Sequence, residues 1–154
     1  HMWKDKEYLI EYMKNISSLE DTWNKLRDYP YMGPFMAYEV VTDLRHTHLL
    51  ENATDIMTWA NPGPGAMRGL NRLTGRELGF CKRSHPWNDE MKELLEIATT
   101  ERLDGELIPD TNFEMREIEG GLCEFDKYSR TVKKQGTTRS IYKHNKDLPL
   151  VEGL

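Results

Sequence analysis

The 154-residue sequence has little cysteine and no long apolar run, and each absence excludes a class of protein. Its two cysteines, Cys81 and Cys123, are too few and too far apart to indicate a metal site. No stretch is long and apolar enough to span a membrane, and no signal peptide is visible. We therefore expect a cytoplasmic protein with reduced thiols, no metal, no cofactor and no membrane partner.

The chain also lacks an overall positive charge, because its net charge is -5. Its basic residues are nevertheless concentrated in two segments, 65–83, which holds one acid, and 127–146, which holds none. Such segments produce a directional field that could face phosphates. The alternative is a solvated face and a loose tail.

Helical periodicity runs through most of the chain, and no stretch is a convincing strand. We expect helices over 5–15, 19–28, 34–44, 52–59, 66–73, 84–99 and 112–132. Ser17-Ser18-Leu19-Glu20 predicts a capping box before the second helix, and Gly120-Gly121 marks a candidate break in the last. The prediction is an all-α fold, with one compact helical domain over 3–132. His1-Met2 resembles a cloning remnant, and 133–154 is expected to be a basic, irregular C-terminal segment.

A short turn at Tyr31-Met32-Gly33 joins two predicted helices, and Pro34 suits a first helical position. Residues 26–39 resemble the helix-hairpin-helix of the DNA glycosylase superfamily. That resemblance implies a DNA phosphate contact at Tyr31 and Gly33, with a helix N-terminus behind them. The superfamily usually has glycine where Tyr31 stands, and the alternative is an ordinary corner between helices.

The stretch Arg68-Gly69-Leu70-Asn71-Arg72-Leu73 resembles a helix of those glycosylases, but their catalytic aspartate would fall at Gly63. Asp55 lies upstream and aligns with the catalytic aspartate only if a gap is introduced into the alignment. A glycosylase needs a carboxylate beside the sugar, so we do not expect ordinary base excision.

The loop Pro62-Gly63-Pro64-Gly65 is stiff, and its backbone can approach a ligand closely before the next helix begins. Arg68 and Arg72 lie four residues apart on one face of that helix. Gly63, Gly65, Arg68 and Arg72 could together bind a phosphate or pyrophosphate. The alternative is a rigid corner with two solvated arginines.

Three blocks, 31–44, 59–70 and 118–128, together resemble the helical family of thymine hypermodification systems, found in bacteriophages and some related genomes. The family includes the α-glutamyl/putrescinyl-thymine pyrophosphorylases, which are amino acid:DNA transferases, and the helical domain of 5-hydroxymethyluracil DNA kinases. The resemblance implies DNA as a partner, with an amine or amino-acid co-substrate and an upstream domain or kinase. It also implies a phage-infected bacterial cell as the location.

The implied reaction is displacement of a phosphate or pyrophosphate from 5-hydroxymethyluracil by an amine. The resemblance implies a phosphate contact by Lys127 beside the two arginines. It offers Asp43, Glu119 and Asp126, with Glu39 as a further choice, for the base. Tyr31, Trp59 and Tyr128 are candidates for base stacking. Each has a simpler alternative, since Glu39 and Asp43 could face solvent, Trp59 could lie in the core and Cys123 could be a small buried apolar residue.

Three hypotheses remain open at this point. The first is that the chain is an enzyme of DNA base hypermodification. The second is that it is a non-catalytic DNA-binding accessory domain of a larger DNA-modifying enzyme, and the third is that it is a helical protein-interaction domain. It has no P-loop motif and is therefore not itself a P-loop kinase.

Overall fold

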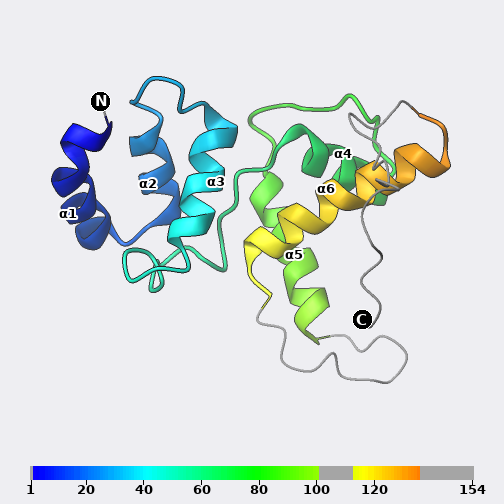
Figure 1. Ribbon diagram of the computed structural model, residues 1–154. Helices are drawn as coiled ribbons and strands as arrows, with labels where there is room; N and C mark the ends of the chain where they lie inside the picture. The colour runs from blue at the N-terminus through cyan, green and yellow to red at the C-terminus, as the bar shows by residue number, and fades with distance from the viewer. Residues whose placement is uncertain (1, 101–112, 136–154) are drawn as a thin grey trace, which may run out of the picture.

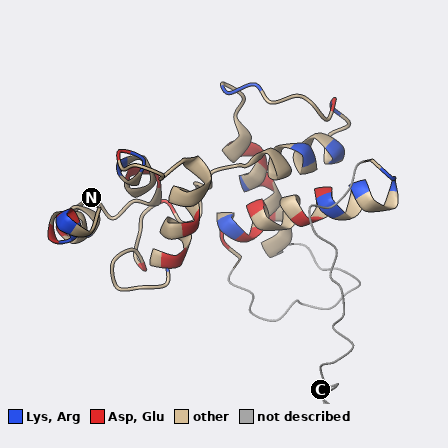
Figure 2. Ribbon diagram, turned by 45° about the horizontal axis from the view of Figure 1, so that its top comes forward, with Lys and Arg blue, Asp and Glu red and all other residues tan. Residues whose placement is uncertain are grey.

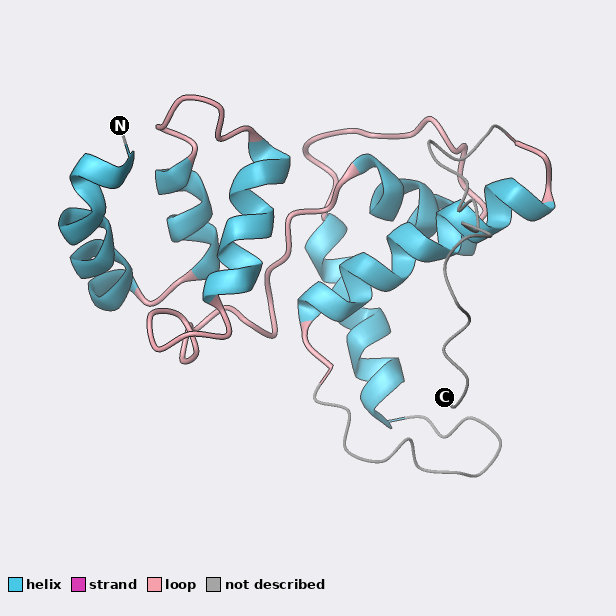
Figure 3. Cartoon of the chain, in the orientation of Figure 1, coloured by secondary structure: helices cyan, strands magenta, loops and turns pink. Residues whose placement is uncertain are grey.

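The computed structural model describes residues 2–100 and 113–135, and within those ranges the chain forms helices and loops without a strand (Figure 1, Figure 3). The predicted all-α fold is confirmed. The elements are the 3-10 helix η1 (Met2–Asp5) and the α-helices α1 (Lys6–Ile16), α2 (Leu19–Leu26), α3 (Pro34–Leu44), α4 (Pro64–Leu73), α5 (Trp87–Thr100) and α6 (Met115–Val132). Most of the predicted segment 133–154 lies outside the described residues.

The helices form two groups, α1–α3 and α4–α6, joined by the segment 45–63 (Figure 1). In the second group α4 packs closely against α6, and α5 packs against both. Buried apolar side chains from both groups and from the joining segment form one core, which includes Leu26, Val41, Leu50, Leu70 and Met115. In the described ranges, no helix combines the length and apolar character needed to cross a bilayer.

The helix predicted over 52–59 is wrong, because that segment forms a series of turns. Its polar groups bond to other parts of the chain. The Asp55 carboxylate accepts from the Ser18 hydroxyl at 2.9 Å and from the backbone N–H of Leu19 at 2.7 Å and of Glu20 at 2.9 Å. The Thr54 N–H donates to the Ser17 carbonyl at 2.8 Å. These tertiary bonds fix the segment to the start of α2, and one local helix-type bond remains, from the Trp59 N–H to the Asp55 carbonyl at 2.9 Å.

The predicted capping box at residues 17–20 is also wrong, because Ser17 and Glu20 do not form it. Ser18 is the N-cap of α2, and its hydroxyl accepts from the Asp21 N–H at 3.1 Å. Asp55, distant in sequence, takes the N–H groups of Leu19 and Glu20 in place of a local side chain. A true capping box occurs at the start of α6, between Glu114 and Glu117.

Helix α6 agrees with the predicted last helix, and it runs through Gly120 and Gly121 without the candidate break. The glycines that matter structurally are in α4, where it crosses α6. A Cβ added to Gly69 would lie 2.4 Å from the carbonyl oxygen of Leu122, and one added to Gly65 would lie 2.8 Å from the Sγ of Cys123. The two backbones can approach this closely only because both positions lack a side chain.

Candidate functional site

Three arginines surround one buried carboxylate between α4 and α6. Asp126, whose side chain is 0% exposed, accepts at Oδ2 from the Nε of Arg68 at 2.8 Å and at Oδ1 from the Nε of Arg72 at 3.0 Å. The Nε of Arg130, one turn along α6, forms an ion pair with Oδ2 at 3.1 Å. We call these four residues the arginine cluster. Because three positive charges face one negative charge, the cluster keeps an excess of positive charge.

The hydrogen bonds within the arginine cluster use only some of the N–H donors of its three guanidinium groups. The Arg72 side chain is 6% exposed, and those of Arg68 and Arg130 are 33% and 30% exposed. Arg72 donates through Nη1 to Gln135 at 2.9 Å, whereas its buried Nη2 has no hydrogen-bond partner among the described residues. The partly exposed guanidiniums leave donors directed to solvent.

Burial raises the pKa of Asp126, but hydrogen bonds from Arg68 and Arg72 and the charges of Arg68 and Arg130 outweigh it, so its pKa lies below the usual range. The carboxylate is therefore ionised and occupied by arginine donors. Asp126 positions these arginines and is poorly suited to accept a proton, which argues against its predicted role as a base.

More cations lie around the cluster, at the end of the domain formed by α4 and the last turns of α6 (Figure 2). Lys133 and Lys134 are exposed there. Lys127 is exposed too, and it pairs with Glu124 on the same helix. We call this surface the basic end; it comprises Arg68, Arg72, Lys127, Arg130, Lys133 and Lys134.

The start of α4 does not offer the open anion site predicted there. Gly63 is the N-cap of α4, and its N–H donates to Oε1 of Glu119 at 3.2 Å. The Cys123 thiol donates to the same oxygen at 3.4 Å. A carboxylate of the chain itself thus occupies the place where an external anion was expected. Gly65 lies within α4 and its free side is filled by Cys123, so it serves helix packing.

Glu119 is the proposed base with the most distinctive environment. Burial raises its pKa, and the hydrogen bonds from Gly63 and Cys123 only partly oppose that rise. Burial, the charge of Glu119 and its hydrogen bond raise the pKa of Cys123 to about 12. Cys123 is therefore a neutral thiol at physiological pH, in agreement with a half-buried packing role.

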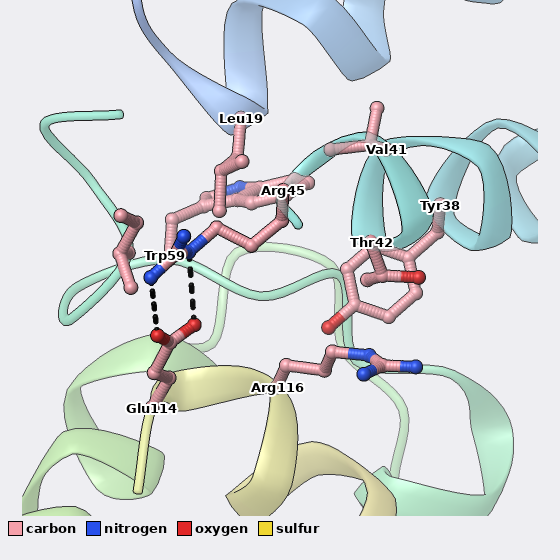
Figure 4. A pocket seen from close by; sticks show the side chains of 9 residues that line it. Leu19, Tyr38, Val41, Thr42, Arg45, Trp59, Glu114 and Arg116 are labelled. Carbon is pink, nitrogen blue, oxygen red and sulfur yellow. Dashed lines mark hydrogen bonds and ion pairs between the residues drawn. The ribbon is translucent and has the colours of Figure 1, made fainter. Parts of the chain in front are cut away.

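Trp59 lies in the core, since it is 7% exposed and its ring centroid is 5.7 Å from those of Trp23 and Tyr38. Arg45 and Glu114 are among the residues that line the small hollow beside it, and they form an ion pair (Figure 4). Arg45 donates from Nη2 and Nε to the Glu114 carboxylate at 2.5 and 3.1 Å. This pair links the end of α3 to the start of α6 and adds a polar contact between the two groups of helices that share the core.

The remaining candidates make no hydrogen bond or ion pair with the arginine cluster in the part of the chain that the structure describes, although Tyr128 lies on α6 between Asp126 and Arg130. Tyr31 is 98% exposed at the α2–α3 turn beside the exposed Gly33, and Tyr128 is 70% exposed on α6. Asp43 is exposed on α3. Asp55, the acid upstream of the expected glycosylase position, is engaged at the start of α2. Within the described ranges, no group of three or more His, Cys, Asp or Glu side chains is placed to hold a metal ion.

Sequence reasoning missed Arg130 as a member of the cluster and treated it only as part of a basic segment. The signal was present, because Asp126 and Arg130 are four residues apart in a predicted helix and so share a face. The pairing of Asp126 with Arg68 and Arg72 had no comparable local signal.

Comparison with known proteins agrees with the resemblance of the three sequence blocks. No significant match to the chain was found among curated proteins or among solved structures. The family model described as "5-hmdU DNA kinase, helical domain" matches residues 1–138, which include every helix of the structure. The chain therefore belongs to the family of the helical domain of 5-hmdU DNA kinases, which is related to thymine hypermodification.

Proposed function

We propose that this chain is a DNA-binding accessory domain that holds the phosphate backbone of DNA at its basic end. Membership in the 5-hmdU DNA kinase family implies action on DNA. The observation that carries the proposal is the arginine cluster, in which three guanidiniums share one buried carboxylate. A surface built only to stabilise the fold would not need this excess of positive charge.

The geometry suits phosphate binding because Arg68 and Arg72 bond Asp126 through Nε, and Arg130 pairs with it by charge alone. Arg68 donates to Asp126 through Nε, and its Nη groups donate to no described residue. A guanidinium already oriented by a carboxylate loses less conformational entropy when its free edge binds a phosphate. Contacts of this kind position DNA without reading its sequence, so binding is expected to be tolerant of sequence and sensitive to salt.

We expect Arg68→Ala to weaken DNA binding by about 1.5–3 kcal/mol, the range for a hydrogen bond to a charged group. Fluorescence anisotropy with a labelled duplex at two salt concentrations measures the affinity, and the loss should shrink as salt rises. Lys92→Ala is the matched control, because it removes one exposed positive charge from α5, away from the basic end. A thermal melt of each variant accompanies the titration. Unchanged affinity with a lowered melting temperature would show that Arg68 serves the fold alone and would contradict the proposal.

A second candidate function, amine transfer to phosphorylated 5-hydroxymethyluracil, is favoured by one observation. Glu119 is a half-buried carboxylate whose pKa is raised, which brings it closer to the working pH of a general base. Glu119 is on α6, and its carboxylate accepts from the Gly63 N–H at the start of α4, next to the loop 61–63. The leaving phosphate in this scheme would bind at the arginine cluster.

If this second function holds, Glu119→Gln should lower the rate of amine transfer by about 10²–10⁴-fold while leaving DNA affinity unchanged. The wild-type rate should rise with pH through the raised pKa of Glu119, because the ionised carboxylate is the active form. Mass spectrometry of nucleosides released from DNA incubated with an amine measures the product. A variant that retains the wild-type rate, or a wild-type protein that makes no product, would rule out this role.

A further inference from the structure

Gln135 covers the most buried guanidinium of the arginine cluster, that of Arg72. Helix α6 ends in a left-handed turn at Lys134, whose φ is 54°. The N–H of Lys134 donates to the Thr131 carbonyl at 3.2 Å and that of Gln135 to the Arg130 carbonyl at 2.8 Å, which is the pattern of a Schellman motif. The turn places the Gln135 side chain against α4, where its Oε1 accepts from Nη1 of Arg72 at 2.9 Å.

The guanidinium of Arg72 is only partly used by the acceptors around it. Its Nε donates to Asp126 at 3.0 Å, and its side chain is 6% exposed. Its Nη2 is buried and has no hydrogen-bond partner among the described residues. Buried donors are rarely left unpaired, and a guanidinium binds most strongly to an anion that accepts from two of its N–H groups at once. The edge formed by the two Nη groups of Arg72 therefore suits an acceptor with more than one oxygen, which Gln135 does not provide.

The charge around this edge favours an anion over the amide that occupies it. Three guanidiniums share one carboxylate in the arginine cluster, and Gln135 contributes no charge to balance them. Lys133 and Lys134, which precede Gln135 in the turn, are exposed cations. A phosphate oxygen carries negative charge, so these groups attract it more strongly than they attract the neutral amide oxygen of Gln135. The hydrogen bond from Arg72 to Gln135 is therefore one that a phosphate can replace.

We propose that Gln135 occupies the place of a phosphate oxygen at Arg72 and moves aside when the phosphate backbone of DNA binds. This inference rests on the proposed DNA binding at the basic end, and it adds a residue that opposes that binding. The hydrogen bond between Arg72 and Gln135 must break before the Nη groups of Arg72 can bind a phosphate, so Gln135 lowers the affinity for DNA. Arg68 needs no such exchange, because its Nη groups donate to no described residue.

Two substitutions of Gln135 in the full chain should change DNA affinity in opposite directions. Gln135→Ala removes the competing acceptor, so anisotropy with a labelled duplex should show binding about two- to tenfold tighter, the equivalent of one net hydrogen bond. Gln135→Glu gives Arg72 a permanent counterion, so binding should weaken by about tenfold or more while the melting temperature does not fall. Thr131→Ala and Thr131→Glu are the matched controls, because Thr131 is exposed one turn earlier on α6 and its hydroxyl bonds to the Lys127 carbonyl of the same helix. The first should leave the affinity unchanged, and the second should weaken it less than Gln135→Glu does.

Gln135 is the only glutamine in the sequence, so glutamine-selective ¹⁵N labelling gives one side-chain amide signal by NMR. In the wild type this signal should shift as the duplex is added, with the same midpoint as the anisotropy titration. A signal that stays in place while DNA binds, or equal affinities for Gln135→Ala and the wild type, would overturn the inference and leave DNA binding at the basic end intact. Weaker binding by Gln135→Ala would also overturn it, because Gln135 would then assist DNA binding. A wild type that binds no duplex would reject the proposed function itself, and this inference with it.

Discussion

Replacing Asp126 with asparagine will lower the free energy of unfolding by about 3–5 kcal/mol, the usual cost of removing one partner from a buried ion pair. Asparagine keeps the shape of the side chain but carries no charge. The Arg72 guanidinium, whose side chain is 6% exposed, then stays buried without a counterion. Arg68 and Arg130 can turn partly toward water, since each is about one third exposed. Urea denaturation of both proteins measures the difference.

Glu124→Gln is the matched control, because Glu124 lies on the same helix and pairs with Lys127 at the surface. An exposed pair of this kind contributes only about 0–1 kcal/mol. Similar small losses for both variants would mean that Asp126 is replaceable and that the arginine cluster is not a unit.

The effect of Asp126 also has a defined pH dependence. Its pKa in the folded protein is lowered, so the ionised carboxylate stabilises the fold fully above the pKa of the unfolded chain, about 3.9. That contribution is lost as pH falls through the lower folded-state value. The difference in stability between wild type and Asp126→Asn should therefore be constant near neutral pH and shrink in acid.

We expect Gly69→Ala to lower the free energy of unfolding by about 1–3 kcal/mol, the usual cost of overpacking. The new methyl group would meet the Leu122 carbonyl oxygen at 2.4 Å and the Leu122 Cβ at 3.0 Å. Because one of these atoms belongs to the backbone, α4 and α6 must move apart to relieve the contact. Thermal and urea unfolding measure the loss.

Gly121→Ala on α6 is the control, because a Cβ there meets no atom within 4 Å. Alanine is a better helix former than glycine by about 1 kcal/mol, so this variant should be more stable than the wild type. If both alanine variants gained stability, the close approach of α4 and α6 would not be essential.

How much could be predicted from sequence depends on whether a feature is local. The bounds of α3, from Pro34 to Leu44, follow from its first proline and the apolar spacing after it. The start of α4 was predicted two residues late, at 66, because Pro64 and Gly65 were assigned to the loop although they form the first turn of the helix. The segment 52–59 could not be predicted in this way, because Asp55 bonds to α2 more than thirty residues earlier, at a separation of 36 from Leu19. Local preference favoured a helix, whereas the structure forms turns whose side chains bond to α2.

The candidate site shows the same division. Arg68 and Arg72 were predicted to share a face because they are four residues apart on one helix, and they do converge on one carboxylate. That the carboxylate is Asp126, 58 and 54 residues away, depends on how α4 crosses α6. Gly69 was not singled out for the same reason, since the partner that requires a glycine there is the backbone of Leu122.

The long separation between Arg68 and Asp126 has a consequence for how the chain acquires its structure during synthesis. Until α6 has emerged, Arg68 and Arg72 have no counterion and the glycine face of α4 has no helix to pack against. Helix α4 has only 10 residues, and an isolated helix of that length is marginal in water. The first group of helices also lacks the ion pair from Glu114 to Arg45 until that moment. Both groups therefore lack stabilising contacts until α6 is present, and we expect truncation before α6 to leave neither group stably folded.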